Sequence, residues 1–384
     1  MNKRSGITLF LLLTIFSLAR ATKNDAVQFD PHINSASVRT VLKAVAGWQM
    51  KTPLVHDPAD WTNGALFAGM VEWASVSGDD SCYKWLKEKG EKLKWDYNHR
   101  EDPHGSYHAD DYCIGQTYIE LYRKYKEKKM IIPIRKHLDE ILNHPATGSL
   151  KFENTPDYWS SQRWSWCDAL FMGPTVWAKM AVVTGKRKYL DFMYNEYKAT
   201  TDYLYDKDED LYYRDSNYFT KKEANGKKIF WGRGNGWVFA GLPIIIRELP
   251  ADYEHRDYFV DIFRQMAARL LQLQLPDGSW HASLLDPSAY PNPEMSATAF
   301  FVFGLAWGIN NGYLDKALYL PAVEKGWIAM TSSVWPDGKV GYIQPIGADP
   351  KSVTGEMTEV YGVGGFLMAG TEILRMIDKG YFAK

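Results

Sequence analysis

The sequence has little of what defines several common protein classes. It contains three cysteines, Cys82, Cys113 and Cys167, and no two of them have the CxxC spacing. An odd number at such spacings predicts neither a disulfide framework nor a zinc site, so we expect small buried residues, with a Cys167–histidine nucleophile as the minor alternative. The formal net charge is only −1, and a surface that binds nucleic acid is therefore not expected.

Long apolar runs are also scarce. One lies at residues 7–18, after Lys3 and Arg4 and before the sequence ARA at 19–21. The run is too short to span a bilayer, and its basic start and small-residue ending predict a secretory signal peptide over residues 1–21. We expect export to a periplasm or out of the cell. No later stretch is apolar enough to predict a membrane span.

Alternating β-type segments are few, whereas a helical phrase recurs along the chain. Segments with a helical period, such as residues 258–274, lie between the copies. Repeats of about 60 residues indicate a repeat architecture, and six helical hairpins predict an all-α fold, a closed (α/α)6 barrel with the phrases as inner helices. We expect a short N-terminal segment over 22–34 and one barrel domain over 35–384. Each copy of the phrase has a glycine near its end, and these are Gly69, Gly115, Gly173, Gly241, Gly304 and Gly370.

Polar and aromatic residues gather at the edges of the repeated phrases. Aromatic residues make up 15% of the chain, with 15 Trp and 24 Tyr. Such rings stack on the apolar faces of sugars, although a large helical core would also use many of them. Because inner-helix ends converge at the mouth of a barrel, we expect one pocket built from several edges. They read DWTNG, HADDYC, RWSWCD, WGRGN and PEMSAT, and begin at residues 60, 108, 163, 231 and 293.

Asp168 is the first candidate for chemistry. It follows Trp164 and Trp166, and burial among such side chains raises the pKa of a carboxyl group, as a general acid requires. A helix N-cap is the alternative for this aspartate. Asp110 and Asp111 form a second cluster, in which one suits the first turn of a helix and the other could face Asp168, as paired acids do in glycoside hydrolysis. No third ligand is spaced with them for a metal ion.

Arg233 lies in the stretch WGRGNGW, residues 231–237. A guanidinium fork matches the two oxygens of a carboxylate, so an acidic sugar, a uronate, is a natural ligand. The alternative is a structural arginine stacked between Trp231 and Trp237. The stretch lacks the GK[ST] ending of a phosphate loop, and nucleotide binding is not expected.

Three stretches, together with the six-fold repeat and the export signal, resemble a known family: WSWCDALFMGP, WGRGNGW and HADDYCIGQ. The family is glycoside hydrolase family 105, the unsaturated rhamnogalacturonyl hydrolases, and the likeness to the unsaturated glucuronyl hydrolases of family 88 is more distant. The resemblance implies an (α/α)6 barrel that acts on lyase-generated oligosaccharides of the pectin or rhamnogalacturonan type. It implies removal of a terminal 4,5-unsaturated uronic acid by hydration of the C4=C5 double bond, with no metal or organic cofactor.

The same resemblance implies roles for single residues. Asp168 protonates C4 and activates the water that adds at C5, and Asp110 is the second acid, with Asp111 as its alternative. Arg233 holds a carboxylate or a hydroxyl group, and Asn235 hydrogen-bonds sugar or ties down the loop. Further substrate contacts are expected from Trp231, Trp237, Trp61, Asn63 and Trp166. Family members use a histidine near the unsaturated ring, and the candidates here are His104, His108 and His281.

Other functions stay open from the sequence. A conventional inverting glycosidase would use Asp110 and Asp168 as base and acid, and a polysaccharide lyase on the same barrel would need Tyr or His as its base. A secreted glycan-binding protein without catalysis would use the same aromatic cleft. The identity of the released sugar and the oligomeric state are not predicted.

Overall fold

The computed structural model describes residues 29–99, 107–155, 158–159 and 162–382. The predicted signal peptide over 1–21 and the candidate His104 lie outside these residues. Strands of the described part form two antiparallel ribbons: β1 (Asn154–Thr155) pairs with β2 (Tyr158–Trp159), and β3 (Tyr205–Asp206) pairs with β4 (Leu211–Tyr212). Short helical elements lie in the connections: η1 (Ala109–Tyr112), η2 (Lys128–Met130), α6 (Ala169–Met172), η4 (Ser216–Tyr218) and η5 (Pro287–Ala289).

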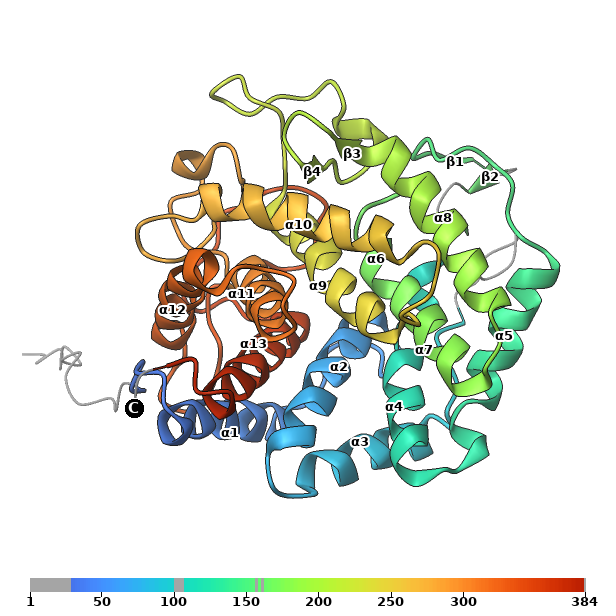
Figure 1. The fold of residues 1–384 in the computed structure, drawn as a ribbon, viewed down its shortest axis with the longest axis horizontal. Helices are drawn as coiled ribbons and strands as arrows, with labels where there is room; N and C mark the ends of the chain where they lie inside the picture. The colour runs from blue at the N-terminus through green and yellow to red at the C-terminus, as the bar shows by residue number, and fades with distance from the viewer. Residues whose placement is uncertain (1–28, 100–106, 156–157, 160–161, 383–384) are drawn as a thin grey trace, which may run out of the picture.

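The longer helices form two concentric rings (Figure 1). Each inner helix contacts the next one around its ring, and the last inner helix contacts the first, so the predicted (α/α)6 barrel is confirmed. The inner ring consists of α2 (Trp61–Val76), α4 (Gly115–Tyr125), α7 (Pro174–Thr184), α9 (Gly232–Glu248), α11 (Met295–Asn310) and α13 (Val360–Asp378). The outer ring consists of α1 (Ser35–Lys51), α3 (Ser81–Lys92), α5 (Ile132–Asn143), α8 (Lys188–Leu204), α10 (Arg256–Leu273) and α12 (Lys316–Ser332).

The two rings differ in how their helices bury side chains. Every residue of α11 is buried, as expected for a helix that is apolar on all sides. The outer helix α10 buries one face, which includes Phe259, Phe263 and Leu270. Among the described residues, α13 is the one helix long and apolar enough to cross a membrane by length and composition. Most of α13 is buried inside the barrel, and its position in the hydrophobic core explains its apolar composition.

The cysteines are buried and unpaired. Burial raises the pKa of the Cys82 thiol to about 11. Burial also raises the pKa of Cys167 well above its usual range, and the neighbouring charge of Asp168 adds to the effect. The expected role as small buried residues is confirmed, and a thiolate nucleophile is disfavoured by this environment.

The C-terminal ends of the inner helices meet in a cluster of alternating charges. Lys179, only 2% exposed, binds Glu120 and lies 3.6 Å from a carboxylate oxygen of Glu248. Each carboxylate in the cluster has at least one cationic partner, and the pairs tie neighbouring inner helices together. We call this set the ion-pair cluster; its members are Glu72, Glu120, Arg123, Lys179, Arg247, Glu248, Glu372 and Arg375.

Glycines allow the inner helices to approach closely. Gly69 in α2 faces Gly364 in α13, and a Cβ atom added to Gly69 would collide with the carbonyl group of Gly364. A Cβ atom at Gly364 would in turn collide with the carbonyl oxygen of Ala65. Backbone therefore packs directly on backbone at the contact that closes the ring, which explains the small residues in this repeated phrase.

We expect Gly69→Ala to destabilise the barrel by about 1–3 kcal/mol, since the obstructing atoms are backbone and cannot rotate away. Gly47→Ala is the matched control, because Gly47 lies inside α1 with no neighbouring atom within 4 Å of an added Cβ. That substitution should stabilise the helix by up to about 1 kcal/mol. Urea unfolding of both variants measures the two effects, and equal midpoints would contradict the proposed contact.

Candidate active site

The N-terminal ends of the inner helices share one end of the barrel, opposite the ion-pair cluster. Several of the polar edges expected from the sequence lie here: Asp60 caps α2, Trp231 precedes α9, and Glu294 caps α11. The connections that lead from outer to inner helices cover this end, and they include residues 205–231 and 333–359. Groups from separate hairpins are thereby brought to one mouth.

Asp168 lies just before α6 in a protected setting. The residue is 9% exposed, and its carboxylate makes no capping hydrogen bond to α6. The Cys167 thiol donates to Asp168 Oδ2 over 3.3 Å, and Arg214 Nε lies 3.9 Å from the same oxygen. Burial raises the pKa of Asp168, and the charges of Arg214 and Arg233 offset part of that rise. A carboxyl group in this environment is suited to hold a proton and donate it.

His108 lies beside Trp166, with ring centroids 4.5 Å apart. Its Nδ1 accepts a hydrogen bond from the backbone N–H of Asp110 over 3.3 Å and lies 3.7 Å from Asp110 Oδ2. The backbone of Trp166 pairs with Asp215, which joins this group to the segment that carries Arg214. The structure thus places the His108 ring against the tryptophan two residues before Asp168, with Asp110 beside His108.

The other candidate histidine of the described chain has a different place. His281 Nδ1 lies 3.1 Å from the carbonyl oxygen of Pro287, and its Nε2 lies 4.0 Å from Asp277. His108 is the candidate that the structure connects to Asp168. Between the neighbouring acids, Asp111 is fully buried, whereas 16% of the Asp110 side chain is exposed. Asp110 is therefore better placed to meet a ligand.

Arg233 lies in the first turn of α9 and is 1% exposed. Its Nη1 donates to the carbonyl oxygen of Gln344, and its Nη2 donates to that of Pro345 over 2.9 Å. The guanidinium lies over the rings of Trp231, at 4.4 Å, and Tyr361, at 4.8 Å. The fork expected to hold a carboxylate is occupied by backbone carbonyls. Arg233 braces the 333–359 connection, and the second stacking ring is Tyr361 instead of the expected Trp237.

The other residues of WGRGNGW also stabilise the interior. Trp231 and Trp237 are buried, and Trp237 packs against Phe300 with centroids 4.4 Å apart. These rings do not offer the sugar-facing wall expected from the sequence. Asn235 accepts from the Tyr212 N–H over 2.8 Å and donates to the Tyr212 carbonyl oxygen over 3.1 Å. Of the two roles expected for Asn235, the structure favours tying down the loop.

The edge of α2 contributes one accessible ring. Trp61 is partly exposed and stacks on Tyr361 with centroids 5.3 Å apart. Asn63 is buried and donates to the carbonyl oxygen of Asp57 over 2.8 Å. Trp61 can therefore meet a sugar at the mouth, whereas Asn63 holds the turn before the helix.

Arg214 is a site residue that the sequence reasoning missed. It lies in the short segment DLYYRD, which reads as an ordinary β-type piece, and no glycine or tryptophan marks it. Asp215 accepts from Arg214 Nη1 over 2.6 Å, and the guanidinium lies 4.8 Å from the ring of Phe152. The one indication in the sequence was that this arginine lies between tyrosines and an aspartate. Its position beside Asp168 is seen only in the folded chain.

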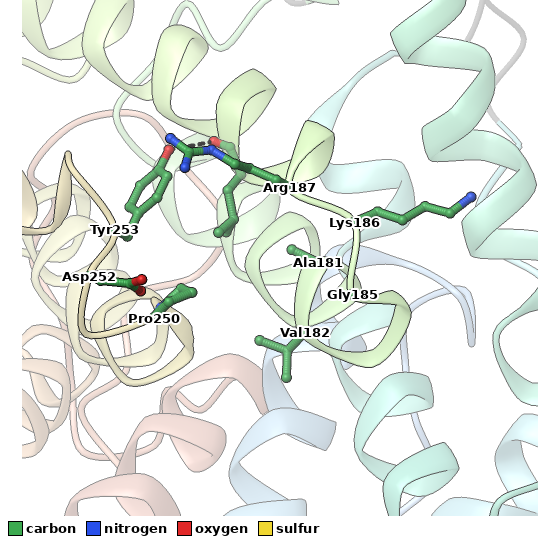
Figure 2. Close-up of a pocket in the computed structure, with 9 residues that line it drawn as sticks. Ala181, Val182, Gly185, Lys186, Arg187, Pro250, Asp252 and Tyr253 are labelled. Carbon is green, nitrogen blue, oxygen red and sulfur yellow. Dashed lines mark hydrogen bonds between the residues drawn. The ribbon is translucent and has the colours of Figure 1, made fainter.

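The barrel also has a cavity of about 350 Å³ at the opposite end (Figure 2). It lies between the turn that follows α7 and the turn that follows α9, with Val182 and Pro250 on facing sides. Arg187 at its rim is paired with Asp191 and Glu254. No acid comparable to buried Asp168 lines this cavity, so the candidate active site remains at the N-terminal ends of the inner helices.

Comparisons with known proteins agree with this fold. The family model described as Glycosyl Hydrolase Family 88 matches residues 34–377. An unsaturated 3S-rhamnoglycuronyl hydrolase of Alteromonas sp. (strain LOR) is 39% identical, over 93% of this chain and 91% of that protein. A solved structure named Glycosyl hydrolase family 88 from Bacteroides vulgatus has a TM-score of 0.80 and 31% identity, over 89% of this chain and 99% of that chain. Another, named Polysaccharide Lyase, has a TM-score of 0.81 and 32% identity, over 91% of this chain and 99% of that chain.

Proposed function

This chain belongs to glycosyl hydrolase family 88, and from that membership we propose the sugar to which its substrate's unsaturated uronic acid is attached. The general activity follows from the relatives: the chain is a glycoside hydrolase that removes a terminal unsaturated uronic acid. The resemblance drawn from the sequence placed family 105 first and family 88 second, and the matching model is that of family 88. We propose that the attached sugar is rhamnose bearing a 3-O-sulfate, which is how we read 3S in the names of the relatives.

Asp168 carries the proposed mechanism, because its burial and raised pKa are what the first step requires. Its carboxyl group gives a proton to C4 of the enol ether, and the electron pair of the C4=C5 bond forms the new C4–H bond. Water then adds at C5 and returns a proton to the Asp168 carboxylate. The hemiketal at C5 opens to a ketone, and the hemiacetal left at C1 collapses and releases the rhamnose-terminated remainder.

Asp110 is proposed as the second acid near the double bond. Its position beside His108 and its partial exposure support that role over Asp111. His108, backed by the buried ring of Trp166, and the partly exposed Trp61 would line the pocket for the unsaturated ring. We also propose that the chain is exported, on the basis of the basic and apolar N-terminal sequence.

A panel of disaccharides tests the proposed substrate. The unsaturated uronic acid would be linked to 3-sulfated rhamnose, to unsulfated rhamnose, as in a pectin-derived product, or to an amino sugar, and a saturated uronic acid linked to rhamnose is the control. We expect the enol-ether absorbance to disappear fastest with the sulfated compound and the saturated compound to remain intact. Preference for unsulfated rhamnose would support the pectin-type source expected from the sequence and overturn the 3-sulfate assignment.

The structural relative named Polysaccharide Lyase makes lyase activity the second candidate. The two reactions change the absorbance in opposite directions, because a lyase creates the enol-ether absorbance and this hydrolase removes it. Incubation with an intact uronate-containing polysaccharide therefore separates them. Rising absorbance there, with no loss of absorbance from the unsaturated disaccharides, would establish a lyase and overturn the hydrolase proposal.

A further inference from the structure

We propose that Arg214 binds the carboxylate of the unsaturated uronic acid and orients the double bond toward Asp168. This inference rests on the proposed function and adds a residue to the same site. The role replaces the one expected for Arg233 from the sequence. It is argued from the position of Arg214, from its remaining donors and from the chemistry of the reacting ring.

The position of Arg214 is set by contacts on two sides. Asp215 accepts from Nη1 over 2.6 Å, and the Phe152 ring lies 4.8 Å from the guanidinium carbon. The backbone carbonyl of Arg214 accepts from the Cys167 N–H over 2.8 Å. These contacts fix the arginine against the segment that carries Asp168, with Nε 3.9 Å from the Asp168 carboxylate.

Within the part of the chain that the structure describes, Arg214 has donors without a hydrogen-bond partner. Among the described residues, its hydrogen bond to Asp215 uses Nη1 alone, and the buried Nε has no hydrogen-bond partner. Arg233, the other cation whose charge acts on Asp168, also has a buried Nε without a partner in the described chain, but it donates both terminal nitrogens to backbone carbonyls. The Arg214 side chain is 16% exposed, so an incoming carboxylate can meet the terminal nitrogens, of which the bond to Asp215 uses Nη1 alone.

The reacting ring places its own carboxylate in reach of Arg214. Asp168 protonates C4, and the substrate carboxylate is attached to the adjacent C5, so the two groups are separated by only two carbon–carbon bonds from C4 to the carboxyl carbon. An arginine within 4 Å of the proton donor is therefore beside the substrate carboxylate when the donor meets C4. Arginine suits this ligand because its planar fork hydrogen-bonds carboxylates and stays charged.

The charge of Arg214 also acts on the acid itself. The groups that face Asp168 are the Cys167 thiol, Arg214 and Arg233. Tyr218 and Tyr361 lie close enough that the charge of Asp168 contributes to their raised pKa. Arg214 lowers the pKa of Asp168 against the effect of burial. Loss of this cation should raise the pKa at which Asp168 gives up its proton, and the alkaline limb of the activity profile should move to higher pH.

The test uses Arg214→Gln and Arg214→Lys in the full chain, with Arg269→Gln as control. Arg269 is an arginine of α10 that pairs with Glu209, and no contact between Arg269 and Asp168 is found among the described residues. The substrates are an unsaturated disaccharide with a free uronate and the same compound as its methyl ester. We expect Arg214→Gln to lower kcat/KM for the free uronate about ten- to a hundredfold and to abolish the preference for acid over ester. Arg214→Lys should recover part of that preference, and Arg269→Gln should match the parent.

Several outcomes overturn the assignment. One is an Arg214→Gln enzyme that prefers acid over ester as strongly as the parent and keeps the same alkaline limb. A loss seen with 3-sulfated rhamnose but absent with unsulfated rhamnose would assign Arg214 to the sulfate instead. If Arg214→Gln does not fold, as judged by circular dichroism, the lysine variant decides by the same acid-to-ester comparison.

Calorimetry separates this inference from the proposed function. A parent enzyme that processes none of the unsaturated disaccharides contradicts the proposed function. Binding of the free uronate and its ester to the parent and to Arg214→Gln still tests the inference, because it needs no turnover. Weaker binding of the acid, with ester binding unchanged, is expected, and equal affinity of both proteins for the acid overturns it.

Discussion

Replacing Asp168 by asparagine is expected to lower kcat by about a hundred- to ten-thousandfold while KM changes little. The amide cannot donate a proton to C4 or accept one from water, yet it keeps the size of the buried side chain. The Cys167 thiol, 3.3 Å away, can still donate to the amide oxygen, so the pocket should keep its shape. Loss of the enol-ether absorbance measures turnover, and calorimetry on the inactive variant measures substrate affinity.

Asp208→Asn is the matched control for Asp168→Asn, because 93% of the Asp208 side chain is exposed. It should leave kcat unchanged. If Asp168→Asn stays within about tenfold of the parent, Asp168 is not the acid. The pH profile is a second check: burial raises the pKa of Asp168, so the protonated, active form persists below that raised pKa. Activity should fall as the pH rises through it.

Removing the buried ammonium group of the ion-pair cluster should cost about 3–5 kcal/mol of unfolding free energy. Lys179 is 2% exposed, and Lys179→Met leaves Glu120 and Glu248 facing each other with one cation fewer. Methionine approximates the shape of the lysine stem, so the cost arises from uncompensated charge. Guanidinium unfolding measures it, and kcat on the folded fraction should be unchanged because the cluster lies opposite the active site.

The control for Lys179→Met is Lys198→Met, which removes an exposed lysine paired with Asp202 and should cost at most about 1 kcal/mol. Acid titration adds an independent check. Burial alone would raise the pKa of Glu72, but Arg247, Arg375 and Lys179 outweigh it and lower that pKa from 4.5 to about 2. This stabilisation is present above pH 4.5 and is lost as the pH falls from there toward 2.

In Lys179→Met, the acid-dependent loss of stability between pH 4.5 and 2 should be smaller than in the parent. Glu248 is expected to contribute in the same way, since Arg123, Lys179 and Arg247 lower its pKa to about 2 against the effect of burial. An unchanged dependence on pH, with a loss below 1 kcal/mol, would show that the cluster does not act through Lys179.

The barrel could be predicted from the sequence because the same helical-hairpin pattern recurs along the chain. A glycine recurs where an inner helix is closely packed, against backbone at Gly69 and against a side chain at Gly304. The spacing of apolar residues indicates the helices of each hairpin separately. Asp168 could also be singled out, because the neighbouring tryptophans report a local apolar setting. Each of these inferences depends on residues close together in the chain.

The roles within the site depend on distant partners, and there the sequence was a weaker guide. Arg233 shows why: its fork is taken up by carbonyls 111 and 112 residues further along the chain, which no local pattern indicates. Glycines at alternate positions are compatible both with a helix buried in the core and with a ligand loop. The same limit hid Arg214, since only the pairing of its backbone with Cys167 brings it to Asp168.

The contact between α2 and α13 has a consequence for how this chain is made. Arg375 bonds Glu72 across 303 residues of sequence, so α2 can make this contact with α13 only after the ribosome has synthesised those residues. Loop closure over such a distance is slow compared with forming a single hairpin. We therefore expect the nascent chain to be an open arc of hairpins, in which α2 has not yet packed against α13. If the proposed export is right, late closure of the barrel would leave time for the polypeptide to cross a membrane before α2 and α13 pack together.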